Sequence, residues 1–325
     1  MHVIKAAVIG LGRWGKSLVE AVQGRSSLLR FVHGVSKEPE SVADFAAKHR
    51  FRLSTELETA LADPEVAVVF LATPHSLHVP QALAVAQAGK HLWCEKPLAL
   101  RRNEAERIIE ACSRANVVLA TGLNKRWFSS MRALERIVRS GEIGELLHLE
   151  GHYCNEHSTR VVGGGWRDDP GESPGLGMTG AGLHVLDAFV NLAGCVESVD
   201  VRVFARKPPP DPRDTIAVLL QFASGATGTM GTVRAGPMYW RVQAFGTNGW
   251  VEAQGEDRVC VAPMGQRPEL REFPHVDPLF GAVEAFASAI ATGTAFPIAP
   301  VQMLDTIGAF EAVIKAANTG RRVTL

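Results

Sequence analysis

The chain has 325 residues, of which 46% are hydrophobic and 21% charged, and its 34 basic side chains balance its 34 acidic ones. This composition is typical of a globular protein, and the length suits two domains because single cores stop growing at about 250–300 residues. The charge balance gives no support for nucleic acid or an anionic membrane as a partner. No apolar run approaches the roughly 18–20 residues of a membrane-spanning helix, so we expect no membrane association.

The five cysteines are scattered and never spaced C-x-x-C, which indicates reduced thiols in a reducing compartment. Residues 1–10 carry one lysine and a short apolar stretch, without the small-residue cleavage site of a secretory signal. We therefore expect a cytoplasmic protein. No set of ligands has the spacing of a zinc finger, and we expect no metal site.

The first 120 residues alternate between strand-like and helix-like segments, which predicts a doubly wound parallel sheet. The strand segments are short and apolar, as expected for strands that are buried on both faces. The helical segments carry apolar residues at helical spacing, and two of them end at Gly24 and Gly89. We predict strands over 5–10, 28–36, 65–73, 91–95 and 117–122, and helices over 14–24, 39–50, 81–90 and 103–115.

The pattern changes after residue 122. A helix is predicted over 131–144, and the glycine- and proline-rich segment 161–177 is predicted to be an active-site loop or a mobile segment. A second helix is predicted over 181–194. Several short strands with turn signals follow without intervening helices, which predicts a mostly antiparallel open sheet. A long helix is predicted over 301–320.

Three glycines with the spacing G-x-G-x-x-G, Gly10, Gly12 and Gly15, lie between the first predicted strand and the first helix. In a βαβ unit the first makes a tight turn, the second lets the backbone approach a pyrophosphate, and the third lets helix and strand pack closely. The N–H groups at the start of the helix then bind the phosphates. This pattern predicts a dinucleotide-binding turn, with Arg13 and Trp14 beside the cofactor.

The end of the second strand indicates which dinucleotide binds. NAD-binding domains usually place Asp or Glu there, about 20 residues beyond the glycines, to bind the ribose 2′-hydroxyl. Here the strand leads into Ser36 and Lys37. A hydroxyl followed by an ammonium suits a 2′-phosphate, so we expect NADP to be preferred, with NAD as the other cofactor to consider. The alternative is that Lys37 is a solvated loop residue and that Glu38 binds the ribose.

These patterns together predict an α/β chain of two domains. Residues 1–122 form a Rossmann domain, a doubly wound parallel sheet that binds the dinucleotide. Residues 123–325 form an α+β domain with a large, mostly antiparallel open sheet, which binds substrate and mediates oligomerisation. The C-terminal helix, about 301–318, is expected to pack back on the Rossmann domain.

A second motif, Glu95-Lys96-Pro97, directly follows a predicted strand, at the carboxyl edge of the sheet where ligands bind. Together with other motifs in the same order, it resembles the Gfo/Idh/MocA family of NAD(P)-dependent oxidoreductases, the relatives of glucose–fructose oxidoreductase and inositol dehydrogenase. The resemblance runs nearly end to end. The other motifs are T-P-x-x-x-H at Thr73, Pro74 and His78, A-G-K-H at 88–91, N-x-R-W at Asn124, Arg126 and Trp127, and S-G-x-I-G at 140–144.

The resemblance implies the catalytic roles. Lys96 hydrogen-bonds the substrate hydroxyl or carbonyl and assists proton transfer, and Pro97 follows a cis peptide bond that aims this lysine into the cleft. His184 takes the proton of the alcohol as hydride leaves to the nicotinamide. Glu95 lies beside the nicotinamide. The cofactor-binding residues are Gly10, Gly12, Arg13, Trp14, Gly15, Ser36, Lys37, Thr73, Pro74, His78, Glu95 and Lys96. The H-x-x-H pair of His75 and His78 falls where the family uses no metal.

The sequence departs from the family at one position. Many members carry Asp four residues before the histidine, whereas this chain has Gly180. Thr179 offers a weaker hydrogen bond, and Asp187 and Asn191 lie on the same helix face as His184. Either Lys96 does most of the proton transfer, or His184 mainly binds substrate, or turnover of ordinary sugars is slow.

Aromatic and basic side chains near the predicted loop are candidates to line the substrate cleft, because they suit hydroxylated or carboxylated sugars. The alternative is that they are ordinary surface and core residues. The strand before the loop ends in alternating side chains, some of which point into the cleft. That strand end carries His152, Tyr153, Asn155 and His157. The substrate-binding residues are predicted to be Lys96, Arg126, Trp127, Tyr153, Trp166, Thr179 and His184.

The sequence therefore predicts an NAD(P)-dependent dehydrogenase or reductase. It transfers a hydride between the nicotinamide and a secondary alcohol or ketone, or C1 of an aldose, in a sugar, inositol or related polyol. Gly180 motivates an alternative, a non-catalytic dinucleotide- or sugar-binding regulator or sensor on the same fold. A methyltransferase that uses S-adenosylmethionine also has a glycine turn, but it leaves the Glu95-Lys96-Pro97 segment unexplained.

The predicted open sheet alternates apolar and polar residues, as in 215–222 and 226–233. Members of the family commonly pair such sheets. The resemblance therefore implies a homodimer or homotetramer through the C-terminal domain. The alternative is a sheet face that the chain's own loops cover.

Overall fold

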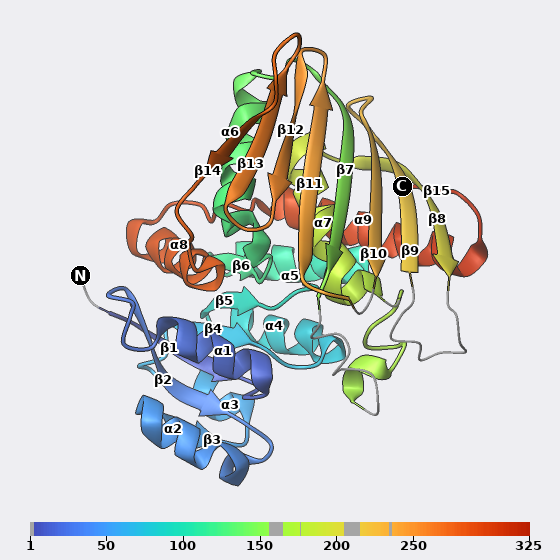
Figure 1. The fold of residues 1–325 in the computed structure, drawn as a ribbon. Coiled ribbons are helices and arrows are strands. Elements are labelled where there is room, and N and C mark those ends of the chain that lie inside the picture. The colour runs from blue at the N-terminus through green and yellow to red at the C-terminus, as the bar shows by residue number, and fades with distance from the viewer. Residues whose placement is uncertain (1–2, 156–164, 176, 205–214, 234–235) are drawn as a thin grey trace. The chain divides into compact units, whose positions relative to one another are not determined.

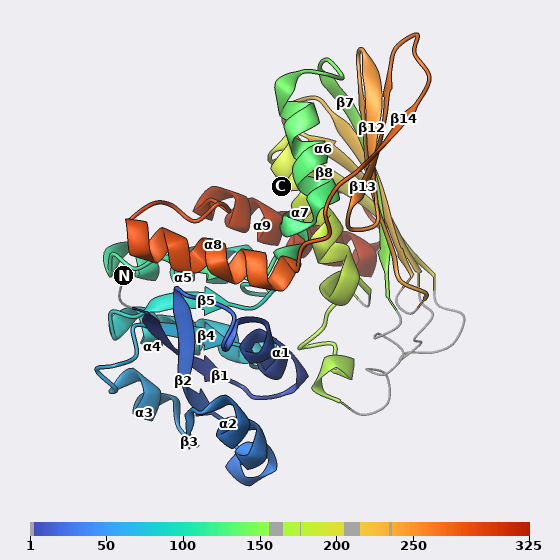
Figure 2. The ribbon, with the colours of Figure 1, turned by 60° about the vertical axis from the view of Figure 1, so that its left-hand side comes forward.

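The computed structural model describes residues 3–155, 165–175, 177–204, 215–233 and 236–325. The chain divides into two compact units (Figures 1 and 2). The first unit comprises Met1–Asn124 and Leu279–Met303, and the second comprises Lys125–Pro278 and Leu304–Leu325. The division lies two residues beyond the predicted boundary at 122, and it places 279–303, which the sequence analysis assigned to the second domain, in the first unit.

The first unit is built on a six-stranded parallel sheet with the order β3-β2-β1-β4-β5-β6, so the predicted doubly wound sheet is confirmed. The order reverses between β1 and β4. Because connections between parallel strands are right-handed, the helices on either side of this reversal cover opposite faces. The strands are β1 (Ile4–Ile9), β2 (Leu29–Val35), β3 (Arg52–Ser54), β4 (Val68–Leu71), β5 (His91–Cys94) and β6 (Leu119–Thr121).

The helices of the first unit follow the predicted segments closely, with two additions, at 57–61 and 278–292, where no helix was predicted. They are α1 (Arg13–Val22), α2 (Ala43–His49), α3 (Leu57–Leu61), α4 (His78–Gln87), α5 (Arg102–Arg114) and α8 (Pro278–Thr292), with short 3-10 turns at Pro39–Val42 and His75–Leu77.

Helix α8, the longer of the two additions, completes the core of the parallel sheet. Phe286 meets Phe70 of β4 edge-on at 5.9 Å and the Trp93 ring of β5 at 5.8 Å. Phe70 and Trp93 stack at 5.5 Å, and all three side chains are fully buried. The buried residues of α8 recur at helical spacing, which is the sequence signal that identifies it. They are Leu279, Ala282, Val283, Phe286, Ala287 and Ala289.

The second unit is built on a nine-stranded sheet with the order β14-β13-β12-β11-β7-β10-β9-β8-β15. All neighbours are antiparallel except β7 and β10, so the predicted mostly antiparallel sheet is confirmed. The strands are β7 (Leu146–Cys154), β8 (Val196–Phe204), β9 (Thr215–Phe222), β10 (Thr227–Val233), β11 (Tyr239–Gly246), β12 (Gly249–Gln254), β13 (Arg258–Pro263), β14 (Glu269–Glu272) and β15 (Val323–Thr324).

Two helices cover one face of this sheet (Figure 2). Helix α6 (Ser129–Ser140) contacts β12 and β13, and α7 (Leu183–Ala193) contacts β7 and β10. Burial alternates along β9, where every second residue is buried and Leu219 is 50% exposed. This alternation is expected of a sheet with one packed face.

Helix α9 (Pro300–Thr319), which we expected to pack back on the first domain, belongs from Leu304 onward to the second unit. The turns predicted at 223–227 and 246–250 connect β9 to β10 and β11 to β12. The turn predicted over 206–214 lies outside the described residues. In the described ranges no helix is both long enough and apolar enough to cross a membrane.

We predict that Phe286→Ala lowers the free energy of unfolding by about 3–5 kcal/mol, because it leaves a cavity between α8 and the sheet. Chemical denaturation monitored by circular dichroism measures this change. Ser288→Ala, at an exposed position of the same helix, is the matched control and should change the free energy by less than about 0.5 kcal/mol. Equal effects of the two substitutions would show that α8 does not complete this core.

Candidate functional site

The three glycines of the turn after β1 each meet a different constraint. Gly10 has a φ of +91°, and a Cβ there would lie 2.7 Å from the Ala72 carbonyl oxygen. A Cβ on Gly15 would lie 2.0 Å from the Gly10 carbonyl oxygen, so only glycine lets α1 start this close to the turn. A Cβ on Gly12 would meet nothing within 4 Å. Gly12 therefore faces open space, where a ligand can approach the backbone.

The start of α1 suits an anionic ligand. Gly12 is its N-cap and supplies no side-chain cap, and no acidic residue lies in the first turn. The first N–H groups of a helix have no intrahelical acceptor, and the helix dipole favours negative charge there. A pyrophosphate at Gly12, Arg13 and Trp14 fits this arrangement.

The loop after β2 places Ser36 and Lys37 where the sequence predicts them. The Ser36 N–H donates to the Ser54 carbonyl oxygen at 3.0 Å, and the Glu38 N–H donates to Ser36 Oγ at 3.3 Å. Both Lys37 and Glu38 are exposed. The Ser36 hydroxyl is thus held by the backbone of its own loop, next to a solvated ammonium and a solvated carboxylate.

A buried histidine joins the loops that follow β4 and β5. His78 is fully buried, its Nδ1 lies 2.8 Å from the Pro97 carbonyl oxygen, and its Nε2 lies 3.2 Å from the Thr73 carbonyl oxygen. Thr73 Oγ1 donates to Gln81 Oε1 at 2.6 Å. The Lys96–Pro97 peptide bond is cis, as the resemblance implies. His78 therefore acts as a positioning residue for both loops, with its ring nitrogens at backbone carbonyls.

Glu95 is buried beneath this loop. Trp93 Nε1 donates to Glu95 Oε1 at 2.9 Å, and the Lys96 N–H donates to Oε2 at 3.4 Å. Burial raises the pKa of Glu95, while the indoles of Trp93 and Trp14 and the Lys96 charge oppose that rise. The carboxyl group lies against Gly122, where a Cβ would be 2.3 Å from Oε2. Glu95 thus supports the backbone that carries Lys96.

In the second unit, His184 is the second residue of α7 and is 6% exposed. A π-helical turn, Met178–Gly182, leads directly into α7, and such turns are frequent at functional sites. Thr179 Oγ1 donates to the Pro174 carbonyl oxygen. Gly180 is exposed, and a Cβ there would meet open space.

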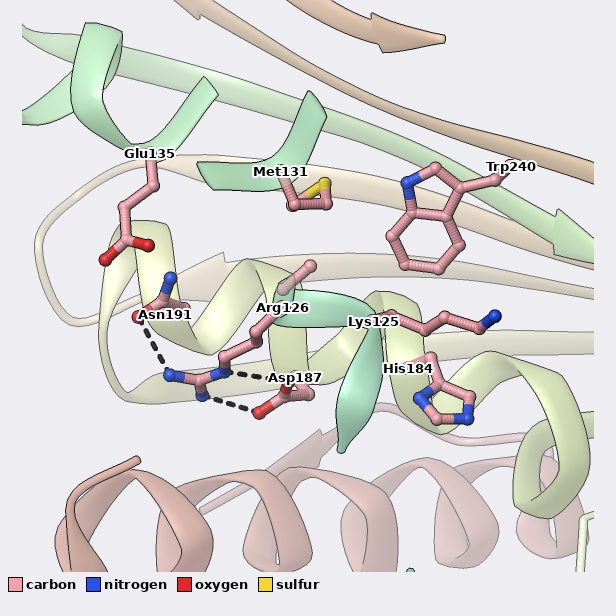
Figure 3. Close-up of a pocket in the computed structure, with 9 residues that line it drawn as sticks. Lys125, Arg126, Met131, Glu135, His184, Asp187, Asn191 and Trp240 are labelled. Atoms are coloured by element: carbon pink, nitrogen blue, oxygen red, sulfur yellow. Dashed lines mark hydrogen bonds and ion pairs between the residues drawn. The ribbon is translucent and has the colours of Figure 1, made fainter. Parts of the chain in front are cut away.

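Asp187, one turn further along α7, binds Arg126 (Figure 3). Arg126 Nε donates to Asp187 Oδ2 at 2.9 Å and Nη2 donates to Oδ1 at 2.5 Å, while Nη1 donates to Asn191 Oδ1 at 2.9 Å. Burial raises the pKa of Asp187, and Arg126 opposes that rise. The two α7 residues that we expected on the face of His184 therefore hold the guanidinium group.

A pocket of the second unit gathers His184 and side chains from three other elements. The Tyr153 ring of β7 lies edge-on to the His184 ring at 5.9 Å and to the Trp240 ring at 5.4 Å. Lys125 also lines this pocket, and the sequence analysis missed it because the N-x-R-W motif leaves its position open. Burial lowers the pKa of Lys125 to about 8, and Glu256 opposes this effect. Lys125 lies between Asn124 and Arg126 of that motif, in the 3-10 turn Asn124–Trp127, and this position is the signal that could have identified it.

Two further predicted residues are placed by the structure. Trp127 is 8% exposed. Trp166 lies in the 3-10 turn Trp166–Asp168, with the Arg167 guanidinium 4.1 Å from its ring centre. His157 and residues 161–164 and 176 of the predicted loop lie outside the described residues.

The structure thus gathers Thr73, His78, Glu95, Lys96 and Pro97 at the carboxyl edge of the first unit. It gathers Lys125, Arg126, Tyr153, His184 and Asp187 in the second. Two family models match the chain along most of its length. "Oxidoreductase family, NAD-binding Rossmann fold" matches residues 4–123, and "GFO/IDH/MocA C-terminal domain" matches residues 131–252. The chain belongs to the Gfo/Idh/MocA family.

Among its Gfo/Idh/MocA relatives, levoglucosan dehydrogenase of Pseudarthrobacter phenanthrenivorans is 26% identical over 260 residues, which cover 72% of this chain and 65% of that protein. The scyllo-inositol 2-dehydrogenase (NADP(+)) IolW of Bacillus subtilis is 27% identical over 167 residues, which cover 51% of this chain and 46% of that protein. The alignments therefore span less than two thirds of the length of these relatives.

Solved structures show the same fold over the whole chain. Levoglucosan dehydrogenase in complex with NADH and levoglucosan has a TM-score of 0.88 at 21% identity, covering 99% of both chains. Aldose-aldose oxidoreductase from Caulobacter crescentus, complexed with glycerol, has a TM-score of 0.87 at 25% identity and covers 100% of both chains.

The glycine turn of this family member gives a matched pair of substitutions. We predict that Gly12→Ala leaves the free energy of unfolding within about 1 kcal/mol of the wild type but weakens dinucleotide binding at least about tenfold, since its Cβ occupies the space open to a ligand. Gly15→Ala should instead destabilise the fold by about 3 kcal/mol or more, because the Gly10 carbonyl must move. Thermal unfolding and fluorescence titration with NADPH and NADH measure both effects.

A Gly12→Ala variant that binds both dinucleotides as tightly as the wild type would contradict this assignment of the open face. So would a Gly15→Ala variant with unchanged stability.

Proposed function

We propose that this protein is an NADP-preferring dehydrogenase or reductase that acts on a CH–OH group of a sugar, inositol or related polyol, at a secondary alcohol or ketone or at C1 of an aldose. The observation that carries the proposal is the glycine turn, in which Gly12 faces open space at an uncapped helix start. Relatives named levoglucosan dehydrogenase and scyllo-inositol 2-dehydrogenase support the substrate class.

The proposed cofactor site lies in the first unit. Gly10, Gly12 and the first N–H groups of α1 hold the pyrophosphate, and Ser36 and Lys37 bind the ribose 2′-phosphate. The bound dinucleotide supplies the hydride acceptor or donor. Support for NADP comes from the absence of Asp or Glu directly after β2 and from the relative IolW, which is named for NADP(+). Levoglucosan dehydrogenase was solved in complex with NADH, so NAD is the alternative cofactor to test.

Two residues are assigned to proton transfer. Lys96 donates a hydrogen bond from its ammonium group to the substrate oxygen and favours the developing alkoxide. His184 accepts the hydroxyl proton during oxidation and returns it during reduction. The side chains of Trp127, Tyr153, Trp166 and Thr179 are assigned to substrate binding.

A regulator or sensor on the same fold is the second candidate. Gly180 favours it, because the exposed position before α7 carries no carboxylate and Asp187 is engaged by Arg126. The two candidates differ in turnover, since a sensor binds dinucleotide or sugar without reaction.

We further propose a homodimer or homotetramer formed through the second unit's sheet, in the cytoplasm. Exposed apolar side chains on the strands support the first point, among them Leu147, Leu219 and Tyr239, which are 49–51% exposed. The five cysteines, which form no disulfide, support the second.

The ribose assignment predicts the outcome of one substitution. Wild-type protein should bind NADPH at least about tenfold more tightly than NADH, and Ser36→Asp should reverse this preference because a carboxylate repels the 2′-phosphate and accepts the 2′-hydroxyl. Fluorescence titration with both reduced dinucleotides measures the ratio. Ser27→Asp, at an exposed position before β2, is the control. Tighter NADH binding by the wild type would refute the NADP preference and leave the fold assignment intact.

Turnover is tested with a panel of sugars and polyols by the absorbance of the reduced nicotinamide. We expect Lys96→Ala to lower kcat/KM by about 100- to 10,000-fold, the usual range for a general acid or base. Lys48→Ala, exposed on α2, should behave as wild type. Unchanged turnover in Lys96→Ala would remove Lys96 from the chemistry. Dinucleotide binding with no turnover across the panel would favour the sensor.

A further inference from the structure

The pocket of the second unit holds an ammonium group among aromatic rings. Lys125 Nζ lies 4.3 Å from the Phe128 ring centre and 5.5 Å from the Tyr153 ring centre. Figure 3 shows Lys125 extending beside the His184 ring, with the Trp240 indole on its other side. Within the part of the chain that the structure describes, Lys125 Nζ forms no hydrogen bond or ion pair. Aromatic rings attract the ammonium charge, but they do not accept hydrogen bonds from its three N–H groups as oxygen atoms do.

The other charges that line the pocket are neutralised by partners. Arg126 is paired with Asp187, and Glu135 is paired with Arg139 at 2.8 Å. Among the described residues that line the pocket, Lys125 therefore carries a positive charge without an ion-pair partner. Glu256, before β13, is the acidic group that faces Lys125 electrostatically, and it stands 3.7 Å from His275.

Lys125 is half-buried. A cation that is partly removed from water without an acceptor is costly, and an anionic ligand relieves that cost. A carboxylate offers two oxygen atoms to the ammonium group, and its charge-assisted hydrogen bonds are stronger than those of a neutral hydroxyl. The Tyr153 and Trp240 rings, which pack edge-on at 5.4 Å, border the Lys125 side chain and offer no acceptor of their own. A polyhydroxy acid supplies such a carboxylate together with hydroxyl groups.

We propose that Lys125 binds a carboxylate group of the substrate, so that the pocket selects polyhydroxy acids, such as aldonates and uronates, over neutral polyols. The assignment of these acids as substrates rests on the proposed function, whereas their binding to the pocket does not. Lys125 is then the residue that determines specificity, and His184 beside it contacts the hydroxyl-bearing part of the same ligand.

The charge state of Lys125 gives the proposal a pH dependence. The ionisable groups that face it are His184, Tyr153 and Glu256. With a pKa of about 8, Lys125 is protonated below that pH and loses its charge above it. Affinity for an acid should therefore be greatest below about pH 8 and fall up to about tenfold per pH unit above it. Lys125→Arg should remove this decline, because a guanidinium group stays charged throughout.

The experiment is isothermal titration calorimetry of the full chain with D-gluconate, D-glucuronate and D-glucose, from about pH 7 to about pH 10. We expect the wild type to bind at least one of the acids at least about tenfold more tightly than glucose. Lys125→Met should weaken acid binding about 10- to 100-fold and leave glucose binding little changed. Lys315→Met, exposed on α9, removes the same charge elsewhere in this unit and should match the wild type.

The outcomes separate this inference from the proposed function. Tight acid binding that depends on Lys125, without turnover, supports the inference and refutes the proposed enzymatic function. Turnover of neutral polyols without tighter binding of acids refutes the inference and supports the proposed enzymatic function. If Lys125→Met fails to fold, the test compares the affinity for acids of the wild type and of Lys125→Arg across the pH range. The proposal is overturned if neither protein loses affinity above about pH 8. Binding of no acid by the wild type also overturns it.

Discussion

The second unit depends on the buried ion pair between Arg126 and Asp187. Both charges are removed from water, and such a pair is tolerated only when its geometry is good and its remaining hydrogen-bonding groups are satisfied. Arg126 meets that condition through its two bonds to Asp187 and a third to Asn191. Loss of either partner would leave an uncompensated buried charge, which costs about 3–5 kcal/mol.

This pair also sets where two of the candidate site residues lie. Arg126 belongs to the turn before α6, whereas Asp187 and Asn191 belong to α7. The bond between them fixes that turn against one face of α7. Lys125 and His184, the neighbours of Arg126 and Asp187 along these elements, consequently line the same pocket. A structural contact thus decides the position of two candidate binding groups, and Asp187 is unavailable for the simpler role of orienting the imidazole.

Sequence periodicity predicts most of the fold because most strands and helices of the first 122 residues carry their own local signal, whereas the short elements β3 and α3 were not predicted. The glycine turn is predictable for the same reason, since steric limits on Gly10 and Gly15 arise within one βαβ unit. Helix α8 shows the limit of this reasoning. Its apolar spacing is visible, but its partners Phe70 and Trp93 lie about 200 residues earlier in the chain. Lys125 was not predicted for a related reason, since its half-buried position beside the Phe128 and Tyr153 rings is a tertiary property and lysine is normally exposed.

The division of the chain has a consequence for its biosynthesis. The first unit is discontinuous, because α8 and residues up to Met303 join a sheet whose strands end at Thr121. While a ribosome makes the second unit, the faces of Phe70 and Trp93 that α8 covers remain without their cover. Folding of the nascent dinucleotide-binding unit is therefore completed only after more than nine tenths of the chain has been translated, and this unit is exposed to chaperones and proteases for that interval.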